Sequence, residues 1–183
     1  AATWLGEATL PAFAAPPKFP SGIDPQNTLV IDSTKGRIVI KLRTDLAPKH
    51  DERLKQLARD GFYNNVPFHR VMTGFMAQTG DGKNFDGTGG SKYPNLKSEF
   101  TPPPFKRGVV GMARAQDPNS ANTQFFICLG DASFLNGKYT VVGDVVSGMD
   151  VVDKLKKAPT GSASGTVTDP DQMVKVQVAS DIK

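Results

Sequence analysis

The chain has few of the residues that form disulfides, metal sites and covalent catalytic centres. Its 183 residues include one cysteine and two histidines. A single cysteine rules out an internal disulfide bond. Cys128 follows the apolar run Phe125-Phe126-Ile127, so we expect it to pack in a buried strand as a small apolar side chain. We predict neither a metal site nor a cofactor.

Long apolar runs and basic runs are also absent. No apolar stretch is long enough to span a membrane. The net charge is +4 and the lysines and arginines are scattered, so we expect no nucleic-acid partner. The chain has neither a heptad repeat nor a broad apolar stripe, which favours a monomer.

Five glycines crowd one stretch without forming a nucleotide-binding motif. Glycine-rich loops can hold phosphate, but neither GxxxxGK[ST] nor GxGxxG precedes a predicted helix here. We interpret the stretch as a tight surface loop that needs positive φ angles. Its glycines are Gly80, Gly82, Gly87, Gly89 and Gly90.

The composition fits one folded domain with an extension before it. Hydrophobic residues make up 38% of the chain and charged residues 22%, which is typical of a globular protein. We place the domain at residues 28–183 and the extension at residues 1–27. Five prolines between Pro11 and Pro25 predict an extended lead-in.

The extension also resembles an export signal. Ala12-Phe13-Ala14 has the small-x-small pattern of a signal-peptidase site, which predicts a periplasmic location. An ordinary extension on a cytoplasmic protein is the alternative, and the charge of Glu7 favours it because export signals have an apolar centre.

Most predicted elements are strands. Runs rich in β-branched residues at 28–32 and 37–42 flank Ser33-Thr34-Lys35-Gly36, which indicates a hairpin. Strands set among only two helices, without strict βαβ alternation, favour an antiparallel β architecture. Further strands are expected at 109–113, 124–129, 140–145 and 174–178, and a second helix at 148–156.

A first helix is predicted from Pro48 to Asp60. Leucines and an alanine repeat there at helical spacing, Pro48 suits the first turn and Gly61 suits the C-terminal cap. Asp51 would lie near the apolar stripe, one turn before Leu54. We expect the helix dipole to make its charge tolerable there.

The most informative segment is FHRVMTGFMAQTGD, residues 68–81, which predicts two adjacent short strands. Alternation would place Phe68, Arg70 and Met72 on one face of the first strand. Past a bend at Gly74, Met76 and Gln78 would share one face of the second. The result is an apolar floor with a guanidinium at its edge, which suits binding and polarising a neutral group.

Rotation about an Xaa-Pro bond requires no more than such a site. The reaction makes and breaks no covalent bond, yet its barrier is about 18–20 kcal/mol because amide resonance is lost on twisting. An apolar pocket for the proline ring, with a cation near the imide nitrogen, would bind the twisted state better than either planar state.

Four blocks in this order and spacing resemble the cyclophilin-type peptidylprolyl isomerases. They are FHRVMTGFMAQTGD, GTGG at 87–90, GMARA at 111–115 with NTQFFI at 122–127, and FLNGKY at 134–139. The resemblance covers roughly Thr28 to Ile182. It implies an eight-stranded antiparallel barrel capped by two helices, with a proline pocket on the outer surface. It also implies proline-containing peptides and unfolded proteins as partners, and a role in assisting protein folding.

The resemblance assigns roles to individual residues. Arg70 is the implied catalytic cation, and Gln78 would orient it. The residues implied to contact substrate are Phe75, Met76, Ala113, Arg114, Ala115, Gln124, Phe126, Phe134, Leu135 and Tyr139. Where eukaryotic members often carry tryptophan and histidine, this chain has Phe134 and Tyr139, as bacterial-type members do. A phenyl ring lacks the indole N–H donor, so we expect weak cyclosporin binding.

The sequence is also compatible with two other function classes. A binding module could hold proline-containing segments with rotation incidental, although such a module has less need of Arg70. A hydrolase could use Cys128 or a serine with His69, but neither an exposed thiol nor a nucleophile elbow is evident. We expect His69 and His50 to serve packing or hydrogen bonding rather than acid–base chemistry.

Overall fold

A computed structural model of the protein describes residues 19–182. The predicted signal-peptidase pattern at Ala12-Phe13-Ala14 lies outside the described residues. The described part begins with a short lead-in that contains the 3₁₀ turn η3 (Pro25–Asn27). Its turn is capped by Asp24, whose carboxylate accepts a hydrogen bond from the backbone N–H of Gln26 at 3.0 Å.

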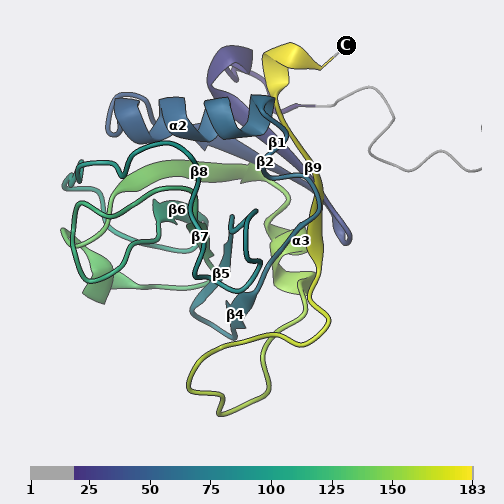
Figure 1. Ribbon diagram of the computed structural model, residues 1–183. Helices are drawn as coiled ribbons and strands as arrows, with labels where there is room; N and C mark the ends of the chain where they lie inside the picture. Colours follow the sequence, from purple (N-terminus) through teal and green to yellow (C-terminus); the bar gives the residue numbers. More distant parts are fainter. Residues whose placement is uncertain (1–18, 183) are drawn as a thin grey trace, which may run out of the picture.

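Within residues 19–182, nine strands form one antiparallel sheet in the order β3-β9-β1-β2-β8-β6-β7-β5-β4. The two edge strands are consecutive in the chain, because β3 ends at Pro67 and β4 begins at Arg70. The sheet therefore curls until its edges come within a few residues of each other (Figure 1). The strands are β1 (Thr28–Ser33), β2 (Gly36–Leu42), β3 (Val66–Pro67), β4 (Arg70–Met72), β5 (Met76–Thr79), β6 (Val109–Met112), β7 (Phe125–Cys128), β8 (Val141–Ser147) and β9 (Gln172–Val178).

This architecture confirms the expected fold class, a mainly β antiparallel barrel with two α-helices. Every strand and helix expected along the chain is present, and no end differs by more than two residues from the prediction. The hairpin between β1 and β2 turns at Ser33 and Gly36, as expected, and Ser33 Oγ donates to the Gly36 carbonyl at 2.7 Å.

The helices are α2 (Pro48–Arg59), which lies across one end of the barrel, and α3 (Met149–Lys154) (Figure 1). Leu54 and Leu57 of α2 are fully buried in the main core, as the periodicity predicted. Gly61 follows the helix with φ of 75°, which a glycine tolerates at a C-terminal cap. No helix among residues 19–182 has the length and apolar character needed to cross a membrane.

A second, smaller core cluster lies against the outer side of β5 and β7. It supports the candidate site described below. It is built on the buried residues Met76, Phe105, Phe126, Cys128, Ala132, Leu135 and Val141. Cys128 is fully buried in β7, as expected. Phe75, Ala113 and Tyr139 pack against the cluster from its partly exposed side. Pocket residues in this region therefore also seal a core.

The structure corrects the expected face of Phe68. Residues 68 and 69 lie between β3 and β4 rather than in a strand, and Phe68 is fully buried in the main core together with Val71. Arg70 and Met72 face the other way. Alternation fails at Phe68 because residues 68 and 69 are not part of a strand, so only residues from Arg70 onward follow the two-residue period.

Candidate active site on the barrel wall

Three neighbouring strands bring the predicted side chains onto one face. Arg70 of β4 lies opposite Gln78 of β5, and Met72 lies opposite Met76. Gln78 in turn lies opposite Phe126 of β7. Cross-strand partners stand about 4.5–5.5 Å apart at Cβ, so a guanidinium, an amide and an aromatic ring become neighbours. The expected grouping of Arg70 and Met72, and that of Met76 and Gln78, are both present.

Arg70 is held by three acceptors. Its Nε donates to the carbonyl oxygen of Ser164 at 2.9 Å, and its Nη1 donates to Gln78 Oε1 at 3.2 Å. Its Nη2 lies 3.7 Å from the sulfur of Met72. Among residues 19–182 no carboxylate forms an ion pair with Arg70. The guanidinium is therefore fixed in place without having its charge neutralised.

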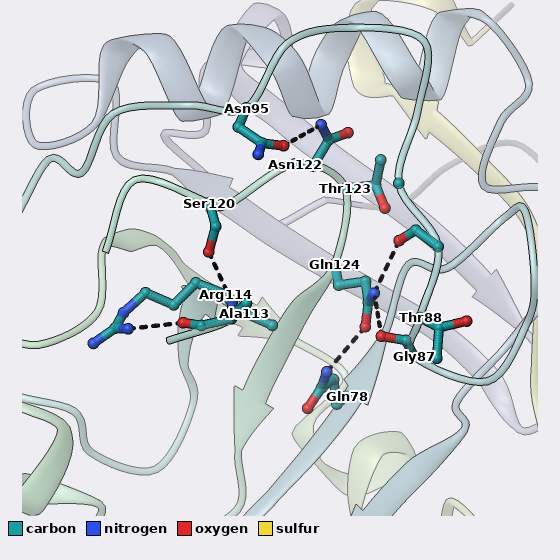
Figure 2. A pocket seen from close by; sticks show the side chains of 13 residues that line it. Gln78, Gly87, Thr88, Asn95, Ala113, Arg114, Ser120, Asn122, Thr123 and Gln124 are labelled. Atoms are coloured by element: carbon teal, nitrogen blue, oxygen red, sulfur yellow. Dashed lines mark hydrogen bonds between the residues drawn. The ribbon is translucent and has the colours of Figure 1, made fainter. Parts of the chain in front are cut away.

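Gln78 is itself oriented by a second amide. Gln78 Nε2 donates to Gln124 Oε1 at 3.1 Å. Gln124 Nε2 donates to the carbonyl oxygens of Gly87 and Gly89, at 2.9 and 3.1 Å (Figure 2). A chain of hydrogen bonds thus runs from the glycine-rich loop to the guanidinium of Arg70.

The glycine-rich loop is organised by the buried carboxylate of Asp81. Five backbone N–H groups of residues 83–89 donate to its two oxygens, at 2.8–3.2 Å. These donors hold the pKa of Asp81 at about 2 against the opposing effect of burial. The role of Asp81 was not predicted from the sequence, although an aspartate among glycines is a signal for a turn in which the carboxylate accepts from nearby backbone N–H groups.

The expected reason for the glycines is only partly right. Gly80 and Gly87 have φ of 102° and 99°, as a tight loop requires. Gly82 and Gly89 have no such φ, and space is their constraint. A Cβ on Gly82 would overlap the backbone of Phe62, and a Cβ on Gly89 would overlap the Asp81 carboxylate.

A cavity of about 140 Å³, which we call the apolar cavity because most of the side chains that line it are apolar, opens beside Arg70. Two ring contacts shape its floor. Phe126 meets Tyr139 edge-on with centroids 5.8 Å apart, and it packs against Phe105 at 5.7 Å. The lining residues are Arg70, Phe75, Met76, Gln78, Ala113, Arg114, Phe126, Leu135 and Tyr139.

A second cavity of about 330 Å³ adjoins the first and is lined mostly by glycines and polar residues (Figure 2). Gln78, Ala113 and Arg114 line both cavities. Of the residues expected to contact substrate, Ala115 and Gln124 line this second cavity and not the apolar one. The backbone N–H groups of Ala113 and Ala115 are already used, by the Gln124 carbonyl and by Ser120 Oγ, each at 2.9 Å.

Phe134 lies at the rim rather than in either cavity. Its side chain is 62% exposed and tilts against Phe75 with centroids 5.4 Å apart. Arg114 crosses the face of Tyr139 at 4.7 Å and donates to the carbonyl oxygens of Lys138, Ala115 and Gln116. Phe134 and Tyr139 are the two positions at which the sequence differs from the common eukaryotic pattern. Tyr139 lines the apolar cavity, and Phe134 lies beside it against Phe75.

The family model described as "Cyclophilin type peptidyl-prolyl cis-trans isomerase/CLD" matches residues 28–178. The chain belongs to this cyclophilin family. The match spans most of the chain, which confirms both the expected family and the expected enzyme class, a peptidyl-prolyl cis-trans isomerase.

Curated relatives support the same assignment for this cyclophilin. It is 54% identical over 173 residues to a probable peptidyl-prolyl cis-trans isomerase of Brucella suis, which covers 89% of this chain and 88% of the relative. It is 42% identical over 144 residues to peptidyl-prolyl cis-trans isomerase B of Escherichia coli, which covers 69% of this chain and 82% of the relative.

Solved cyclophilin structures share the fold of this chain. The cyclophilin AquaCyp293 from Hirschia baltica has a TM-score of 0.78 at 27% identity, covering 88% of this chain and 77% of that one. A Cryptosporidium parvum cyclophilin, crystallised in the presence of the dipeptide Ala-Pro, has a TM-score of 0.75 at 27% identity, covering 82% of this chain and 98% of that one.

The buried titratable groups of this cyclophilin do not assemble a hydrolase. Burial raises the pKa of the Cys128 thiol to about 12, so the thiolate that such an enzyme needs is disfavoured. Burial lowers the pKa of His69, whose ring nitrogens contact no partner among the described residues. His50 is also buried, with Nδ1 2.6 Å from Glu99 Oε1. Both histidines fit packing or hydrogen bonding, as expected.

Proposed function

We propose that the protein accelerates rotation about Xaa-Pro bonds in peptides and in unfolded or flexible protein segments. The apolar cavity beside Phe126 holds the proline ring, and Arg70 stabilises the twisted imide. The observation that carries this proposal is that a guanidinium without a carboxylate partner lines the same cavity as Met76, Phe126 and Leu135.

The reaction asks little of the protein in energetic terms. Shortening an isomerisation from tens of seconds to milliseconds is roughly a 10,000-fold gain, or about 5.5 kcal/mol. As the bond twists, the nitrogen lone pair localises and can accept a hydrogen bond that the planar imide accepts poorly. A donor aimed at charge that develops only in the transition state is worth about 2.7–4 kcal/mol in other enzymes. Exclusion of water from the cavity floor would supply the rest.

The substrate class follows from the cavity and from the relatives. The apolar cavity admits one ring-sized group. The lining offers only a few polar contacts to the substrate residues that precede proline, which favours broad specificity. Similarity to a cyclophilin crystallised with Ala-Pro supports short proline-containing peptides as substrates. Clients in folding, weak cyclosporin binding, a monomeric state and a periplasmic location remain predictions from the sequence.

Exchange NMR on an Ala-Pro peptide tests the proposal. We expect the wild type to accelerate exchange strongly, and we expect Arg70→Ala to lower turnover about 100-fold, in line with the loss of one transition-state donor. Arg59→Ala removes the same charge from an exposed position on α2, where Arg59 pairs with Asp181 at 2.9 Å, and is the control. It should keep wild-type turnover.

Two results would count against the proposal. Turnover by Arg70→Ala within about threefold of the wild type would refute the electrostatic role of Arg70. A folded wild type that binds the peptide but gives no acceleration would instead identify a binding module.

A further inference from the structure

The segment between α3 and β9 forms a loop that is hydrogen-bonded at both ends to the backbone of Val71. Ala158 N donates to the Val71 carbonyl at 2.9 Å, and Val71 N donates to the Gly165 carbonyl at 3.0 Å. Val167 N then donates to the carbonyl of His69 at 3.1 Å. This flanking segment, residues 158–167, therefore lies along the side of β4 that β5 leaves free (Figure 1, the yellow-green loop below β4).

The flanking segment contacts the proposed catalytic side chain directly. The carbonyl of Ser164 accepts the Nε–H of Arg70 at 2.9 Å, while Gln78 accepts from Nη1 at 3.2 Å. A planar guanidinium held at both Nε and Nη1 cannot rotate about its long axis without losing one of the two bonds. Ser164 and Gln78 together fix its plane.

Gly165 lets the segment approach this closely. It has φ of +74°, and a Cβ built there would lie 2.6 Å from Met72 Cγ and 3.0 Å from Arg70 Cγ. Gly161 in the same segment has φ of +83°, yet a Cβ there would meet nothing within 4 Å. The two glycines thus share a conformational demand and differ in what surrounds them.

We propose that Gly165 and the Ser164 carbonyl position Arg70 for catalysis. A side chain at residue 165 would press first on Met72, whose sulfur contacts Arg70 Nη2, and then on the stem of Arg70, and would break the Ser164 contact. The apolar cavity would persist, because no residue of the flanking segment lines it. Turnover should therefore fall while proline binding remains. This inference rests on the proposed role of Arg70.

The experiment compares Gly165→Ala with its matched control, Gly161→Ala. Both variants carry the strain of alanine at positive φ, and only the first meets Met72 and Arg70. Peptide Kd and exchange rate are measured by NMR, together with the Nε–Hε resonance of Arg70 in the ¹⁵N-labelled protein, assigned by its loss in Arg70→Lys. The resonance reports the orientation of the side chain rather than folding.

We expect Gly165→Ala to lower turnover at least about 10-fold, since displacements near 1 Å cost enzymes up to about 100-fold. Its Kd should stay within about threefold, and its Nε–Hε resonance should shift. Gly161→Ala should match the wild type in all three. Wild-type turnover in Gly165→Ala, or equal losses in both variants, would overturn the inference. If Arg70→Ala also kept its turnover, the proposed function would fail as well.

Ser162→Ala keeps the test decisive if Gly165→Ala does not fold. Ser162 Oγ accepts the N–H of Gly165 at 3.0 Å, and its removal loosens the turn without adding an atom. Turnover lowered about two- to fivefold, with unchanged Kd and a shifted Arg70 resonance, supports the inference, because one hydrogen bond is worth about 1 kcal/mol. Unchanged turnover and resonance overturn it.

Discussion

Gln78 Oε1 accepts a hydrogen bond from Arg70 Nη1 at 3.2 Å across the β4–β5 pair. The other end of the same amide donates to Gln124 at 3.1 Å. An amide has one accepting and one donating end, so Gln78 makes both bonds in only one orientation. The position of Gln124 thereby determines which end of Gln78 faces the guanidinium.

Gln78→Glu tests this polarity. A carboxylate at residue 78 would place an acceptor oxygen against the acceptor oxygen of Gln124. It would also form an ion pair with Arg70 and so neutralise the charge that stabilises the twisted imide. We expect turnover to fall about 10-fold or more, because a half-buried pair of acceptors left without a proton between them costs about 1–3 kcal/mol. Exchange NMR measures it, with the exposed Gln172→Glu as the control for added charge. Wild-type turnover in Gln78→Glu would contradict the orientation argument.

The carboxylate of Asp81 should stabilise the loop that holds Gln124. Its pKa of about 2 lies below the ordinary value of 3.8, so its contribution is present above pH 3.8 and is lost as the pH falls toward 2. We expect Asp81→Asn to lower the free energy of unfolding at pH 7 by about 1–3 kcal/mol, since each pKa unit is worth about 1.4 kcal/mol.

Urea unfolding of the wild type and Asp81→Asn, from pH 7 down to pH 2, measures that contribution. The difference between them should shrink below pH 4. Asp86→Asn lies in the same loop, where the Asp86 side chain accepts from Thr88 at the exposed surface, and should cost little at any pH. A difference that does not depend on pH would show that the charge of Asp81 is not what the loop requires.

The sequence predicted the site best where side-chain alternation determines it. Arg70 and Met72, and likewise Met76 and Gln78, occupy the expected faces because each pair lies within one short strand. Phe68 failed because the strand does not reach it. The strand patterns alone indicated only an antiparallel β architecture, and the barrel with its outer pocket came from the family resemblance.

The contacts that fix Arg70 in place could not be read from the sequence. Its Nε partner is a backbone carbonyl 94 residues away, and a carbonyl leaves no signature in residue identity. Asp81 likewise acts through backbone N–H groups. Long-range contacts of this kind follow from the closure of the fold and require coordinates.

Phe134 makes the expected weak cyclosporin affinity testable. Its ring is 62% exposed beside Phe75 at the rim of the apolar cavity, where it offers no hydrogen-bond donor. Phe134→Trp supplies an N–H, and we expect it to tighten cyclosporin binding about 10-fold, the equivalent of one hydrogen bond. Calorimetry measures both Kd values. Phe85→Trp, at another exposed phenylalanine, is the control. Nanomolar affinity of the wild type would show that the tryptophan is not needed.

Asp51 should make the stability of the protein fall as the pH rises. The sequence led us to expect the helix dipole to accommodate its charge, but the side chain is fully buried and neither carboxylate oxygen has a partner among the described residues. Burial raises its pKa to about 8, with a further contribution from the charge of Glu99. The folded state therefore holds a proton that the unfolded state releases above pH 3.8.

Asp51→Asn removes this titration and isolates it from that of His50, whose pKa is lowered by burial and whose contribution falls as the pH drops below 6.5. Relative to the wild type, the variant should gain stability steadily from pH 4 to pH 8, by up to about 1.4 kcal/mol per pH unit, and then level off. Urea unfolding at pH 4, 6 and 8 measures the gain, with the exposed neighbour Glu52→Gln as the control. A constant difference would mean that Asp51 ionises normally in the folded protein, which would require that water reaches a carboxylate placed wholly inside the core.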